Sequence, residues 1–94
     1  MYLFIIVYEE VLESEVSAML EEIEPERYIR VEKVKGKWKE KHMGNHIWPG
    51  VYQVVCVMSD GEKKVLLDKK IKDIRHRFPA DEIWGWVINL EKVI

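Results

Sequence analysis

Two kinds of hydrophobic pattern alternate along this chain, and together they predict four strands and two helices. A continuous apolar run at residues 2–8 and an apolar segment at residues 51–58 are rich in β-branched and aromatic side chains, which is typical of strands buried on both faces. Residues 28–34 alternate between apolar and polar, which predicts a half-exposed strand. The fourth strand is predicted at residues 83–90. Its alternation places Trp84, Trp86, Ile88 and Leu90 on one face, and Ile83, Gly85 and Val87 on the other.

Helical periodicity occurs in two segments. The first apolar stripe consists of Leu12, Val16, Met19, Leu20 and Ile23. Glu13, Glu15, Glu21 and Glu22 are expected on the solvent side of this helix. The helix should end at Glu24, because the residue before a proline avoids the helical conformation. The second stripe consists of Leu67, Ile71, Ile74 and Phe78, between a capping turn at residues 59–62 and Pro79.

The resulting order of elements is β-α-β-β-α-β. This order predicts a single α+β domain with a ferredoxin-like fold over residues 1–94. In this fold two helices cover one face of a four-stranded antiparallel sheet. The first, third and fourth strands are nevertheless apolar on both faces. In a sheet with one face in solvent, apolar and polar residues should alternate along each strand. The second face therefore needs a partner, and we expect that partner to be another copy of the chain.

Residues 35–50 form a long loop with three glycines, one proline and no hydrophobic period. Long loops in compact domains are usually functional or disordered. Lysines at positions 35, 37, 39 and 41, with Trp38 among them, are typical of a loop that binds an anion or a protein partner. They are equally typical of a solvated hairpin whose lysines discourage edge pairing.

The same loop contains candidate metal ligands and an aromatic segment. His42 and His46 are four residues apart and could share a divalent metal ion with Glu40, or they could be ordinary polar loop residues. Trp48, which precedes Pro49, could stack on a ligand or anchor the entrance of the next strand.

Outside the loop, few residues suggest chemistry. Arg75, His76 and Arg77 could reach a ligand, or they could simply complement the C-terminus of their helix. Cys56 lies among valines and is expected to be a buried, inert thiol. No nucleophile with an adjacent base, and no paired carboxylates, can be recognised, so an enzyme is not expected.

Composition narrows the class of protein further. The net charge of −2, from 15 basic and 17 acidic residues, gives no global positive field for nucleic acid. The 34% of charged residues suits a soluble surface and is also common in heat-stable proteins. No apolar run approaches the roughly 18 residues of a membrane helix, so no membrane insertion is expected. The apolar N-terminus has no basic leader, which favours a strand over a signal peptide and a cytoplasmic location.

Three short motifs resemble those of the PII-like superfamily, which includes the nitrogen-regulatory PII proteins and the CutA proteins of divalent-ion tolerance. The motifs are Val31-Glu32-Lys33-Val34-Lys35-Gly36, Gly44-Asn45-His46-Ile47-Trp48-Pro49-Gly50 and Ile88-Asn89-Leu90-Glu91-Lys92-Val93-Ile94. They look like the strand leading into the PII T-loop, the exit of that loop, and the last strand with its acidic ending.

The resemblance implies a homotrimer with ligand sites in the clefts between subunits. PII proteins bind adenine nucleotides and 2-oxoglutarate there, and their loop docks on a target protein. Carried onto this chain, the ligand-binding candidates are Lys35, Gly36, Lys37, Trp38, Gly44, Asn45, Trp48, Arg75 and Arg77. Residues 75–83 hold the place of the glycine-rich PII nucleotide loop but contain no glycine, so nucleotide binding is not expected to carry over. The resemblance predicts a signalling protein that binds a small anionic ligand. The alternative is a CutA-like protein that binds a divalent metal through His42 and His46.

Overall fold

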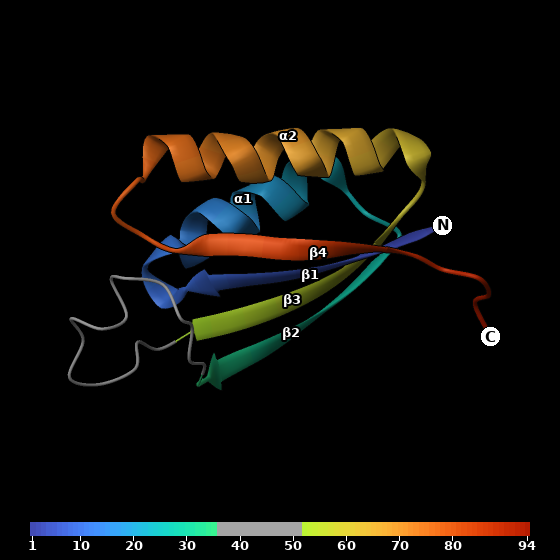
Figure 1. Ribbon diagram of the computed structural model, residues 1–94, viewed down its shortest axis with the longest axis horizontal. Coiled ribbons are helices and arrows are strands. Elements are labelled where there is room, and N and C mark those ends of the chain that lie inside the picture. Colours follow the sequence, from blue (N-terminus) through green and yellow to red (C-terminus); the bar gives the residue numbers. More distant parts are fainter. Residues whose placement is uncertain (36–51) are drawn as a thin grey trace.

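A computed structural model describes residues 1–35 and 52–94, which form one four-stranded sheet with both helices packed on the same face (Figure 1). The strands lie in the order β2-β3-β1-β4, and each adjacent pair is antiparallel. The α+β, ferredoxin-like prediction is thereby confirmed. The elements are β1 (Tyr2–Glu9), a 3₁₀ turn η1 (Glu10–Leu12), α1 (Glu13–Ile23), β2 (Arg27–Val34), β3 (Tyr52–Ser59), α2 (Gly61–Arg77) and β4 (Ile83–Asn89).

The hydrophobic core lies between the sheet and the two helices. Both predicted stripes point into it, with Leu12 supplied by the 3₁₀ turn and Phe78, at the end of α2, only partly buried. The sheet contributes the alternate residues Phe4, Ile6, Tyr8, Val55, Val57 and Ile83.

The helix ends follow the signals in the sequence. Glu24 adopts a left-handed conformation with φ 50° directly before Pro25, and its amide donates to the carbonyl of Leu20. The Asp60 side chain caps α2 by accepting a hydrogen bond of 2.8 Å from the Lys63 amide. Over residues 1–35 and 52–94, neither helix has the length and apolar character needed to cross a membrane.

The other face of the sheet carries no described element and is almost entirely apolar; we call it the open face. The strand register aligns Leu3 with Met58 and Ile88, Ile5 with Cys56 and Trp86, and Val7 with Val54 and Trp84. Strand β2 extends this surface at one edge with Ile29 and Val31. Figure 1 shows both helices on the opposite side of the sheet.

The predicted burial on both faces is therefore only partly correct for a single chain. Val7 and Tyr52 are buried on the open face, but Trp86 is 51% exposed and Ile88 is 43% exposed. Leu3, Ile5, Val54 and Cys56 are half-buried there. The two helices are already used on the other face, so nothing among the described residues shields these side chains.

Two backbone features shape the edges of the sheet. In β4, a Cβ atom added to Gly85 would lie 2.6 Å from the Ile5 carbonyl oxygen and 3.2 Å from the Ile6 Cα atom. Glycine therefore allows β4 to approach β1 closely. In β2 the pairing with β3 shifts between Val31 and Val34, and Lys33 takes a left-handed φ of 56°. This β-bulge bends the end of β2 just before residue 35.

Candidate functional site

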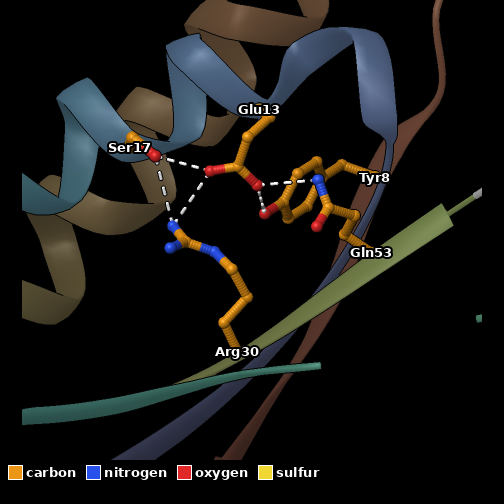
Figure 2. Close-up of polar contacts among 5 residues, drawn as sticks. All are labelled: Tyr8, Glu13, Ser17, Arg30 and Gln53. Atoms are coloured by element: carbon orange, nitrogen blue, oxygen red, sulfur yellow. Dashed lines mark hydrogen bonds and ion pairs between the residues drawn. The ribbon is translucent and has the colours of Figure 1, made fainter. Parts of the chain in front are cut away.

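A polar cluster lies inside the sheet–helix interface, at the end of the sheet where β2 stops and β3 begins. Its centre is the Glu13 carboxylate, which Figure 2 shows surrounded by four side chains. They are Tyr8 from β1, Ser17 from α1, Arg30 from β2 and Gln53 from β3. The cluster therefore connects α1 to three of the four strands.

Both oxygens of the Glu13 carboxylate accept two contacts each. The Tyr8 hydroxyl donates to Oε1 at 2.6 Å, and Gln53 Nε2 donates to the same atom at 2.8 Å. The Ser17 hydroxyl donates to Oε2 at 2.5 Å, and Arg30 Nη2 lies 3.1 Å from it. Arg30 Nη2 also donates to Ser17 Oγ at 3.2 Å. With four donors around one carboxylate, little acceptor capacity remains for a ligand.

The electrostatics hold this cluster in one protonation state. Burial alone would raise the pKa of Glu13, but the hydrogen bonds from Ser17 and Tyr8 and the charge of Arg30 outweigh it and lower the pKa. Burial, followed by the hydrogen bond to Glu13, raises the pKa of Tyr8 to about 12. Glu13 is thus ionised and Tyr8 neutral near pH 7, which suits a structural tie better than proton transfer.

Helical periodicity does not predict this cluster, because it places Glu13 on the solvent side of α1. That assignment was wrong: the Glu13 side chain is only 31% exposed and reaches under the helix to the sheet. The signal that could have revealed it is Gln53, a polar residue in an otherwise apolar run. A buried polar side chain needs a hydrogen-bonding partner from elsewhere in the fold.

Replacing Glu13 by glutamine should lower the free energy of unfolding by about 1–2 kcal/mol at pH 7, because a charge-assisted interaction with Arg30 is lost. The lowered pKa means that this stabilisation is present above the ordinary carboxylate pKa and disappears as pH falls through the folded-state value. Urea denaturation from pH 7 to pH 3 should therefore show the two proteins converging on the acid side. A Glu21→Gln protein, altered at an exposed glutamate of the same helix, is the control. A constant difference at every pH would contradict this role of Glu13.

Three of the predicted ligand-binding residues lie in the described part of the chain. Lys35 is exposed and directly follows β2. Arg75 is exposed and donates from Nε to the Ile83 carbonyl at 3.1 Å. Arg77 is held by two carboxylates, at 2.9 Å from Glu15 Oε1 through Nη1 and at 2.9 Å from Asp73 Oδ2 through Nε. Arg77 is thus largely engaged inside its own chain, whereas no residue among 1–35 and 52–94 makes a hydrogen bond or ion pair with the Arg75 Nη groups.

A single chain does not bring Lys35 and Arg75 together. Lys35 lies at the β2 edge, and Arg75 contacts the first residue of β4, which is the opposite edge. Neighbouring strands lie about 4.8 Å apart, so β2 and β4 at the two edges of the sheet are roughly 14 Å apart. A ligand contacted by both side chains would have to be large, or the two residues would have to come from different subunits.

The other predicted site residues lie outside the described part of the chain. They are Gly36, Lys37, Trp38, Gly44, Asn45 and Trp48, with the proposed metal ligands His42 and His46. Across residues 1–35 and 52–94, no group of three His, Cys, Asp or Glu side chains could hold a metal ion. Cys56 is half-buried on the open face rather than in the core.

Solved structures share the fold of this chain, although no protein-family profile and no curated protein matches its sequence. The apo form of CPII, a nitrogen regulatory PII-like protein from Thiomonas intermedia K12, superposes with a TM-score of 0.60 at 14% identity, covering 95% of this chain and 89% of CPII. A CPII structure bound to ADP, AMP and bicarbonate gives 0.60 at 12% identity, with coverages of 99% and 94%. A DUF3240 family protein from Shewanella baltica OS155 gives 0.65 at 10% identity, with coverages of 98% and 91%. The predicted resemblance to PII-like proteins is confirmed at the level of the fold.

Proposed function

We propose that this chain, which has the PII-like fold, is one subunit of a homotrimer that binds a small anionic ligand between subunits and passes the signal to a protein target. The separation of Lys35 from Arg75 on opposite edges of the sheet carries this proposal. Neither residue alone makes a strong anion site, but an edge-to-edge arrangement of two subunits would supply both. Residues 35–50, for which the sequence predicts a loop, are the proposed contact with the target protein.

The open face supports the oligomer. An exposed apolar surface that runs across all four strands is unusual for a soluble single chain and marks an interaction surface. Three copies arranged around one axis can turn their open faces inward and leave their helices outside. In this arrangement the ends of the edge strands β2 and β4 remain accessible to a ligand.

The charges at this end of the molecule favour a small anion over a nucleotide triphosphate. CPII binds ADP, AMP and bicarbonate. In this chain Arg77 is already neutralised by Glu15 and Asp73. The segment between α2 and β4 carries Asp81 and Glu82, and the Glu82 amide donates to the Glu9 carboxylate at 2.6 Å. Several carboxylates beside one available arginine would repel a highly charged phosphate chain.

Calorimetry with ADP, AMP, bicarbonate and acetate tests this function. We expect one or more of these probes to bind, and Arg75→Ala to weaken that binding about tenfold or more, the effect of losing a charge-assisted hydrogen bond. Lys69→Ala, which removes a cation from the exposed surface of α2, should bind like the wild type. Absence of binding to all four probes would contradict the proposal. Divalent-metal binding that is lost in His42→Ala/His46→Ala would instead support the CutA-like alternative.

A further inference from the structure

The helix-facing side of the sheet carries polar side chains at both of its ends. At the end that holds the polar cluster, the Tyr8 hydroxyl donates to Glu13 of α1 at 2.6 Å. At the opposite end the strand register aligns Tyr2 with Ser59 on β3 and with Asn89 on β4. We call these last three residues the far row. Helix α1 supplies an acceptor to the first end but not to the far row.

The far row has no hydrogen-bonding partner within residues 1–35 and 52–94. The Ser59 hydroxyl is completely buried and makes no hydrogen bond with any of these residues. The side chains of Tyr2 and Asn89 make none with them either. Native proteins pair nearly all of their buried polar groups. A row without partners inside the chain is therefore suited to a partner from outside.

A cavity of about 430 Å³ lies beside the far row, between β4 and the first turns of α2. Figure 1 shows the beginnings of β1 and α2 together with the end of β4 at one end of the molecule. The cavity is lined by four largely apolar side chains and three polar ones, namely Tyr2, Phe4, Val65 and Val87 with Lys64, Asp68 and Asn89. Mostly apolar walls with a few polar groups are typical of sites for small molecules.

Lys64 gives this cavity a cation that no carboxylate among the described residues neutralises. Its Nζ atom lies 4.6 Å from the centre of the Tyr2 ring. Asp68, one turn further along α2, also lines the cavity, but its carboxylate is paired with Lys72 at 3.0 Å. An ammonium group has three donors, so Lys64 can contact the ring and still bind an anion.

We propose that this cavity binds a small aromatic carboxylate. The ring of the ligand packs on Tyr2 and Val87, which supply apolar and aromatic surface. Its carboxylate accepts hydrogen bonds from the Lys64 ammonium and the Asn89 amide. Asp68 lies beside them and repels an anion with two charges, such as phosphate, more strongly than a monocarboxylate.

This site is independent of the proposed site between subunits. Arg75 contacts the first residue of β4, whereas the cavity lies beside its last residues. Along β1 the two ends of the sheet are roughly 20 Å apart. All the lining residues come from one chain, so the cavity needs no second subunit.

Titration with benzoate, followed in amide NMR spectra, tests this site. We expect the amide signals of Lys64, Val87 and Asn89 to shift together and saturate, with half-saturation at about 1 mM or below. Lys64→Met keeps an apolar side chain but removes the charge, and it should raise the half-saturation concentration about tenfold or more. Benzyl alcohol, the neutral analogue, should bind this variant as it binds the wild type. Lys69→Met, altered on the exposed side of α2, should bind benzoate like the wild type.

A second variant tests the cavity itself by filling it. Val87 is an exposed residue of the edge strand β4 and lines the cavity. Val87→Trp should therefore abolish the benzoate shifts while amide signals elsewhere in the chain stay in place. Benzoate binding that survives in a folded Val87→Trp protein would overturn the site. If this variant fails to fold, Lys64→Met decides.

The remaining outcomes separate this site from the proposed function. A titration that leaves the amides of Lys64, Val87 and Asn89 unchanged would overturn the site and leave the trimer and its ligand unaffected. Shifts confined to Arg75 and Ile83 would place benzoate at the site between subunits and would also overturn the inference. Equal benzoate affinity of the wild type and Lys64→Met would show that the cavity does not recognise a carboxylate.

Discussion

Substituting Trp86 by lysine should dissociate the proposed trimer into single chains. Trp86 lies on the open face beside Ile5 and packs edge-to-face on Trp84, with ring centroids 4.5 Å apart. It is 51% exposed in one chain and would be buried in the proposed trimer. A lysine there would bury an unpaired charge, at a cost of several kcal/mol. We expect the half-dissociation concentration to rise more than about a hundredfold, the equivalent of roughly 3 kcal/mol.

The matched control is Val65→Lys. Val65 is 66% exposed and apolar, but it lies on α2, on the opposite side of the sheet. This protein should keep the wild-type assembly and the wild-type sedimentation coefficient. If Trp86→Lys remained fully associated, the open face would not be the subunit interface, and the trimer would need a different surface.

Substituting Gly85 by alanine should lower the free energy of unfolding by about 3 kcal/mol, at the upper end of the range for overpacking substitutions. The added Cβ atom would lie 2.6 Å from the Ile5 carbonyl oxygen. That contact is with backbone, so no side-chain rotation can relieve it, and β4 must move away from β1. Such a movement weakens the ladder and shifts Trp84 and Trp86. Urea denaturation at a fixed protein concentration measures the change.

Gly61→Ala is the control for this substitution. Gly61 is the first residue of α2, and a Cβ atom there would meet nothing within 4 Å. Alanine is the better helix former, so this protein should be at least as stable as the wild type. Equal stability of the Gly85→Ala and wild-type proteins would show that the β1–β4 spacing adjusts without cost.

The sequence alone predicted those parts of the fold that depend on the periodicity of apolar residues within one element. The apolar stripes of both helices fell at helical spacing, and Asp60 and Glu24 marked real helix ends. Three strands are apolar on both faces, whereas the two helices can cover only one face of the sheet. This mismatch also predicted the open face correctly. These features follow from side-chain geometry within one element and from counting layers.

Contacts between distant segments could not be predicted in the same way. Glu13 meets Gln53 across 40 positions, and its place on the helix gives no information about that partner. The resemblance to PII proteins makes Arg77 a ligand candidate, but its ion pair with Glu15 depends on the packing of α2 against α1. Its other partner, Asp73, lies one turn earlier on the same helix. The β-bulge at Lys33 was also missed, since lysine is rarely found in the left-handed conformation.

The position of β1 in the middle of the sheet affects how the chain reaches its native state during synthesis. This first strand pairs with β3 and β4 and not with β2, its nearest strand in sequence. On the ribosome, β1 must therefore wait until β3 has emerged before it finds a strand partner. Pairings between such distant segments slow folding, because a long loop must close before the contacts form. The nascent chain thus exposes an apolar, aggregation-prone strand until β3 follows, and we expect its folding yield to depend on how quickly β3 emerges.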